Sequence, residues 1–260
     1  MSPSSPHAAI DHLWVEETGD GPPVLLVHGL GGTSTYYEPL TRALASSHRV
    51  IRFDLAGHGR SAIGPSGPPS IESWSDDAMA VLDSLAAERI SVVGHSMGTL
   101  VVQHLAATRP GRVDKIVLLG PVRPQPEPAQ AATRERAAKV RAGGMRTVSD
   151  VIVAAALADS VKENHPEVVG FVRELLLGQD PEGYAMGCEA LAAAEGTDPL
   201  AIEAEALLIT GSDDAISPPE LVVEMAAALP RAEAEILDSC GHWSALERGR
   251  EVERLVQAFL

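Results

Sequence analysis

A serine stands at the centre of the pentapeptide Gly-His-Ser-Met-Gly, residues 94–98. An apolar run typical of a strand, residues 90–93, precedes it, and a segment of helical composition, residues 98–108, follows it. A sharp turn from a strand into a helix needs small residues around it, and it exposes the central side chain at the positive end of the helix dipole. The pattern therefore predicts that Ser96 is a nucleophile. The alternative is a glycine-rich turn in which the serine is incidental.

A serine hydroxyl is a poor nucleophile at neutral pH, so a base must take its proton and an acid must orient that base. Of the nine histidines, only His242 follows the last predicted strand of the chain. Asp213 and Asp214 follow the predicted strand before it, which gives the chain order Ser, Asp, His. These positions predict a triad that attacks a carbonyl carbon.

Short runs rich in Val, Ile and Leu alternate with helical segments, as expected for strands buried on both faces of a parallel sheet. The predicted strands cover residues 24–27, 50–53, 90–93, 115–119, 206–209 and 234–237. The predicted helices between them cover residues 38–46, 73–87, 98–108, 219–228 and 247–259. This alternation predicts an α/β fold with a doubly wound, mostly parallel sheet, to which residues 12–17 add an antiparallel edge strand.

The alternation stops between Val122 and Thr197. Prolines form a stiff exit from the sheet, and helical patterns follow at residues 129–141, 149–162, 166–177 and 181–194. A structureless loop of this length would be unusual in a compact domain. We therefore predict a helical cap, residues 122–197, inserted into a core formed by residues 1–121 and 198–260. The candidate catalytic residues all lie outside the cap, so we expect the cap to set substrate choice.

The composition argues against several other classes of protein. Asp and Glu number 36 against 20 Lys and Arg, a formal net charge of −16, whereas a protein that binds nucleic acid or anionic membranes carries a basic face. Two cysteines are too few for a disulfide framework, and no apolar run is long enough to span a membrane. The N-terminus lacks the basic start and apolar core of a signal peptide. We expect a cytoplasmic protein that acts on a small molecule; its oligomeric state stays open.

The segments that surround these candidates resemble the α/β-hydrolase superfamily. In family order they are His-Gly-Leu-Gly-Gly (28–32), Asp-Leu-Ala-Gly-His-Gly-Arg-Ser (54–61), the serine pentapeptide, Gly-Ser-Asp-Asp-Ala-Ile-Ser-Pro (211–218) and Cys-Gly-His-Trp (240–243). The resemblance implies that Ser96 is the nucleophile and His242 the general base. It selects Asp214 as the orienting acid, with Asp213 as the alternative if the loop register differs by one residue.

The same resemblance implies an oxyanion hole made by the backbone N–H groups of Leu30 and Met97. Two glycine-rich segments do not fit cofactor motifs. Residues 28–32 lack the Gly-Lys-Ser/Thr of a phosphate loop, and residues 57–62, which match Gly-x-Gly-x-x-Ala, are followed by a proline-rich stretch that cannot open a helix. We therefore expect no cofactor and no metal. Residues 54–61 are expected to support the pocket floor, with His58 outside the catalytic set.

Within the superfamily the chain is most similar to 3-oxoadipate enol-lactonases, through residues 141–145 and 180–191. It departs from them at His28-Gly29, where they carry Asn-Ser, and at His95, where they carry a small or aliphatic residue. It also has Leu157-Ala158 near the place where they carry Trp-Phe. A lactone is therefore one of several candidate substrates.

The predicted activity is hydrolysis of a small carboxylic ester or lactone through an acyl-enzyme. The aromatic residues that could line its pocket are Tyr36, Phe171, Tyr184 and Trp243, which could equally pack the core. The same residues could run a cofactor-free haloperoxidase, lyase or C–C hydrolase reaction. A small-molecule receptor that keeps the triad is the non-catalytic alternative.

Overall fold

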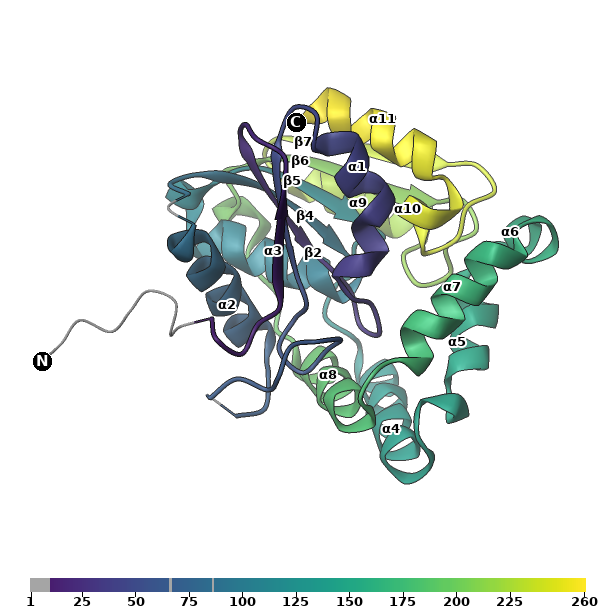
Figure 1. Ribbon diagram of the computed structural model, residues 1–260. Helices are drawn as coiled ribbons and strands as arrows, with labels where there is room; N and C mark the ends of the chain where they lie inside the picture. The colour runs from purple at the N-terminus through teal and green to yellow at the C-terminus, as the bar shows by residue number, and fades with distance from the viewer. Residues whose placement is uncertain (1–9, 66, 86) are drawn as a thin grey trace, which may run out of the picture.

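A computed structural model describes residues 10–65, 67–85 and 87–260 (Figure 1). The N-terminal residues 1–9, on which the signal-peptide argument depended, lie outside the described residues. The centre is a seven-stranded sheet with the order β1-β3-β2-β4-β5-β6-β7. The strands are β1 (Val15–Thr18), β2 (Pro23–Val27), β3 (Arg49–Phe53), β4 (Ile90–His95), β5 (Val113–Leu119), β6 (Glu205–Gly211) and β7 (Ala232–Leu237). Only β1 pairs antiparallel, so the predicted α/β fold is confirmed.

Strands in the middle of the sheet, such as β2, are apolar because their side chains are buried on both faces, whereas the edge strand β7 exposes Glu233 and Glu235. In β2, for example, Leu25 and Val27 belong to one core cluster, whereas Val24 and Leu26 belong to the other. The first cluster includes residues of α2 (Ile71–Ser84), α3 (Met97–Thr108) and α9 (Pro219–Ala228). The second includes residues of α1 (Glu38–Leu44) and α11 (Gly249–Phe259). The sheet therefore lies between two helical layers, as a doubly wound fold requires.

Five further helices lie between β5 and β6, and Figure 1 shows them gathered beyond one end of the sheet. They are α4 (Glu127–Gly143), α5 (Ser149–Ala156), α6 (Asp159–Asn164), α7 (Pro166–Leu177) and α8 (Pro181–Ala193). We call residues 122–197 the insertion. Short 3-10 helices complete the fold: Ser34–Tyr37, Pro110–Arg112, Met145–Thr147 and Pro199–Ala201.

The prediction of a single helix over residues 149–162 is wrong, because two helices, α5 and α6, cover this segment. The backbone of Leu157 is extended (φ −105°, ψ 143°) and separates α5 from α6. The carbonyl of Ala156 accepts a hydrogen bond from the His242 N–H, and the Ala158 N–H donates to Glu247. These long-range partners replace the bonds that would continue the helix.

The candidate residues follow the carboxyl ends of parallel strands, which meet at one edge of the sheet. His28 follows β2, Ser96 follows β4 and Asp214 follows β6. The short helix α10 (Ser244–Glu247) begins just after His242, in the loop that follows β7. Among the described residues, no helix is both long and apolar enough to cross a membrane.

Candidate active site

Ser96 occupies the turn between β4 and α3 in a strained conformation. Its φ is +50° and its ψ −121°, in the left-handed region that a non-glycine residue rarely adopts. A Cβ on Gly98 would collide with the carbonyl oxygens of Val27 and His28, so the turn can pack against β2 only with glycine there. The strain is local, and the tight packing around the turn maintains it.

Three side chains from separate loops form a hydrogen-bonded series. Ser96 Oγ lies 2.7 Å from His242 Nε2, and His242 Nδ1 lies 2.8 Å from Asp214 Oδ2. With the proton on Nδ1, the imidazole donates to the carboxylate, and Nε2 is free to accept the serine proton. The arrangement has the geometry of a nucleophile, a base and an orienting acid.

Asp214, rather than Asp213, contacts the imidazole. Asp214 Oδ1 accepts from the N–H groups of Ile216 (2.9 Å) and Ser217 (2.8 Å). Burial alone would raise the pKa of Asp214, but His242 and these donors outweigh it and hold the pKa below its usual value. Asp213 is exposed and pairs with the neighbouring Ser212 hydroxyl. Asp214 therefore stays ionised beside the His242 imidazole.

A second buried carboxylate, Glu247, holds the loop that carries His242. Its two oxygens accept from the N–H groups of Gly241 (3.0 Å), Trp243 (2.9 Å) and Ala158 (2.9 Å). The His242 N–H donates to the carbonyl of Ala156 at 2.7 Å. The insertion thus supplies backbone partners to the loop that carries His242. The sequence gives no sign of the contact between Glu247 and the insertion.

The loop after β2 lies directly against the serine. A Cβ added at Gly29 would be 2.9 Å from Ser96 Cβ. His28 anchors this loop, because its Nε2 accepts from the Leu55 N–H at 2.9 Å, and burial lowers the pKa of His28 and keeps the ring neutral. Leu30 lines the same cavity as Ser96, and Met97 is the first residue of α3, where an N–H has no partner within the helix. These placements fit two N–H donors on an oxyanion.

A cavity of about 530 Å³ opens beside Ser96 and His242. Tyr184 and Trp243 are among its lining residues. Tyr36 is not: its ring packs behind the site, 4.5 Å between centroids from His95 and 5.4 Å from Trp243. Tyr36 therefore packs in the core, which is the alternative to lining the pocket that the sequence left open.

Phe171 also lies away from this cavity, so we do not retain it as a substrate contact. It lines a separate, more open hollow of about 710 Å³, together with residues of α1, α10 and α11. The reason is the orientation of α7, which places Phe171 toward those helices, whereas Tyr184 on α8 lines the cavity that Ser96 also lines.

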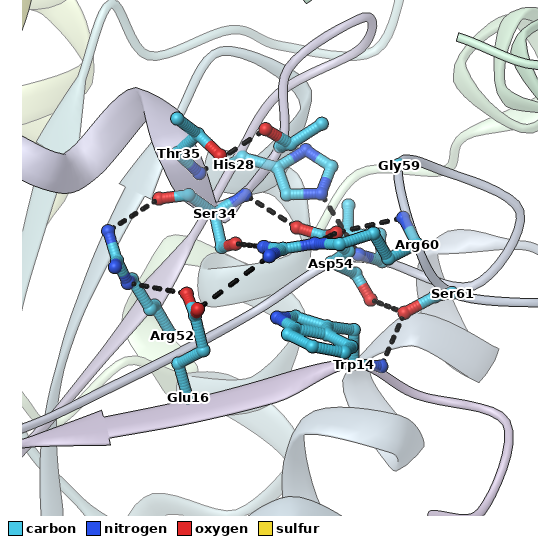
Figure 2. A network of polar contacts seen from close by, with 12 residues as sticks. Trp14, Glu16, His28, Ser34, Thr35, Arg52, Asp54, Gly59, Arg60 and Ser61 are labelled. Atoms are coloured by element: carbon cyan, nitrogen blue, oxygen red, sulfur yellow. Dashed lines mark hydrogen bonds and ion pairs between the residues drawn. The ribbon is translucent and has the colours of Figure 1, made fainter. Parts of the chain in front are cut away.

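The segment that follows β3 forms a polar network away from the triad (Figure 2). Asp54 Oδ1 accepts from the Ser34 N–H at 2.7 Å, and Oδ2 accepts from the N–H and Nε of Arg60 at 2.9 and 3.1 Å. The Arg60 guanidinium also contacts the Ser34 hydroxyl and lies over the Trp14 ring. Burial lowers the pKa of His58, in the same loop, to about 3. The network fixes the loop beside His28, a structural task.

No group of three or more His, Cys, Asp or Glu side chains within residues 10–65, 67–85 and 87–260 is arranged to hold a metal ion.

Comparisons with known proteins place this geometry among hydrolases. Residues 24–255 match the profile described as the alpha/beta hydrolase family. The chain is 30% identical to 2-hydroxymuconate semialdehyde hydrolase from Pseudomonas putida over 259 residues, covering 95% of this chain and 89% of that protein. A thermophilic esterase from Thermogutta terrifontis superposes with a TM-score of 0.91 at 31% identity, covering 95% of this chain and 92% of that one. The enol-lactonase from Burkholderia xenovorans LB400 gives 0.87 at 29%, covering 95% of each chain.

Proposed function

Because this chain belongs to the alpha/beta hydrolase family, we propose that it hydrolyses a small carboxylic ester or lactone through an acyl-enzyme on Ser96. The observation that carries the proposal is the series Ser96 Oγ–His242–Asp214, with contacts of 2.7 and 2.8 Å. The esterase and the enol-lactonase with the same fold support the choice of bond.

The steps follow from the placement of the groups. Ser96 Oγ attacks the carbonyl carbon while His242 Nε2 takes its proton, and the oxyanion accepts hydrogen bonds from the N–H groups of Leu30 and Met97. His242 then gives the proton to the leaving oxygen as the carbon–oxygen bond breaks. Water, activated by the same imidazole, releases the acid and restores Ser96. Asp214 holds the tautomer and stabilises the imidazolium throughout.

A second candidate is hydrolysis of a C–C bond, because the relative at 30% identity is a 2-hydroxymuconate semialdehyde hydrolase. The same base and oxyanion donors would serve there. The two activities are separated by assaying nitrophenyl esters and small lactones beside 2-hydroxymuconate semialdehyde.

The structure of the Thermogutta terrifontis esterase has malate bound, so a small dicarboxylate binds to one relative of this chain.

The first experiment is labelling with a fluorophosphonate probe. Wild type is expected to react, and Ser96→Ala is expected to lose both labelling and turnover while remaining folded, because the half-buried side chain lines the cavity and is absent from both core clusters. Ser46→Ala, at an exposed position at the end of α1, is the matched control and should label like wild type. Equal labelling of Ser96→Ala and wild type would overturn the assignment.

A further inference from the structure

The cavity beside Ser96 is positively charged in an acidic protein. The chain has a formal net charge of −16. Yet no aspartate or glutamate is among the residues that line this cavity, and its charged lining residues are Arg123 and Arg136, beside His95 and His242. A site built for a neutral substrate would not need cationic groups against the general charge of the chain. The contrast points to an anionic substrate group.

The two arginines differ in their partners. Arg123 Nη2 lies 3.2 Å from Glu224 Oε2, so a carboxylate of the protein already pairs with its charge. Arg136 is half-buried and forms no ion pair with a carboxylate of the described residues, and its Nε atom is buried without a hydrogen-bond partner. A guanidinium is always charged and has five N–H donors, so the buried Nε–H of Arg136 costs free energy unless a ligand accepts a hydrogen bond from it.

The surroundings of Arg136 leave this charge uncompensated. The residue lies on α4, and α8 packs against α4 with Tyr184 and Cys188 near the guanidinium. Burial raises the pKa of the Cys188 thiol, so the thiol stays neutral at physiological pH. Most of the remaining wall is apolar, including Leu30, Ile152 and Leu191. The cavity thus has a nucleophile, an apolar wall and one unpaired cation.

We propose that Arg136 binds a carboxylate of the substrate, so that the natural substrate is an acidic ester or lactone: a short apolar acyl chain with a free carboxylate. This assignment rests on the proposed function and names its substrate class. A planar guanidinium pairs with a carboxylate through two parallel hydrogen bonds, which fixes the orientation of the acyl chain as well as its affinity.

The test compares two substrates of equal length: the mono-nitrophenyl ester of glutaric acid, and the same compound with its free acid methylated. Wild type is expected to prefer the free acid in kcat/KM. Arg136→Gln should lower kcat/KM for the free acid by about 10- to 100-fold, as expected for a charge-assisted pair, and change the methylated compound by less than about 3-fold. Arg136→Lys should recover part of the preference.

Two control variants locate the effect. Arg134→Gln removes an exposed arginine from the same helix, outside the cavity, and should change neither substrate. Arg123→Gln removes an arginine that Glu224 already neutralises and should leave the preference for the free acid in place. Equal losses on both substrates in Arg136→Gln, or a preference that depends on Arg123 instead, would overturn the proposal.

Binding separates this inference from the proposed function. In Ser96→Ala, calorimetry with glutarate should show binding that Arg136→Gln weakens by a similar factor, whether or not the wild type turns over either ester. Absence of glutarate binding to Ser96→Ala, or binding unchanged by Arg136→Gln, refutes the carboxylate site. Absence of fluorophosphonate labelling refutes the acyl-enzyme alone.

Discussion

Asp54 and Asp214 are both buried aspartates that follow strands of the same sheet, β3 and β6. Each accepts hydrogen bonds from two backbone N–H groups, and each has a pKa held below its usual value despite burial. The difference lies in the third partner. Asp54 faces the guanidinium of Arg60, which can only donate hydrogen bonds, whereas Asp214 faces the imidazole of His242, whose two nitrogens can donate on one side and accept on the other.

A buried aspartate whose charge is met by hydrogen-bond donors is therefore not in itself a catalytic feature. With arginine it ties loops together (Figure 2). With histidine, and a serine on the far side of that ring, it has the position to orient a base, which is the role proposed for Asp214. Substitutions that remove each charge should therefore separate stability from activity.

The largest effect is expected for Asp214→Asn. An amide at this position can hold His242 in the wrong tautomer, and a comparable change in a serine protease lowers kcat by about 10⁴. The variant is checked by kcat on the preferred ester and by thermal unfolding, which should show a folded protein. Asp213→Asn, one residue away and exposed, is the matched control and should retain activity. If Asp213→Asn proved the more damaging change, Asp214 would not be the orienting acid.

Asp54→Asn should behave in the opposite way. It weakens charge-assisted hydrogen bonds to Ser34 and Arg60, so we expect the free energy of unfolding to fall by about 2 kcal/mol. Because Asp54 does not contact the triad, kcat should change by less than about 3-fold under conditions where the protein is folded. Urea unfolding and ester hydrolysis measure the two quantities. A loss of kcat near that of Asp214→Asn would show that the network has a catalytic role.

Asp54→Asn should also change how the stability of the protein depends on pH. Burial opposes the charge of Asp54, but His28 and the hydrogen-bond donors of Arg60 and Ser34 outweigh it and lower its pKa. An acid whose pKa is lowered by folding stabilises the protein above its unfolded pKa, about 3.9, and this contribution is lost as pH falls toward the folded pKa. Wild type should therefore lose stability below about pH 4 more steeply than Asp54→Asn.

The sequence predicts most of the fold because its signals are local. Strands buried on both faces appear as apolar runs, and the ranges of α7 and α9 follow from a proline at the first helical position. The break at Leu157 could not be predicted, because its cause is the contact with the His242 loop, far away in the sequence.

The candidate site divides in the same way. Ser96, Asp214 and His242 could be proposed from sequence because each follows a strand end within a motif. The placements of Phe171 and Tyr184 depend on how α7 and α8 are rotated by packing. The unpaired state of Arg136 depends on which side chains surround α4, and no sequence pattern reports that.

The smallest effect tests a third carboxylate, Glu247, which resembles Asp54 in its backbone partners but touches the loop of the base. In Glu247→Gln a single oxygen remains, so the variant keeps either the bond to Trp243 or those to Gly241 and Ala158. Burial, and after it the charge of Asp214, raises the pKa of Glu247, so the loss of its charge relieves part of the cost. We expect kcat to fall about 10-fold with little change in KM, because His242 is less well positioned while the cavity is intact, and stability to fall by about 1 kcal/mol. Glu251→Gln, exposed on α11, should change neither. An unchanged kcat in Glu247→Gln would mean that the contact between the insertion and the His242 loop only holds the chain together, as Asp54 does.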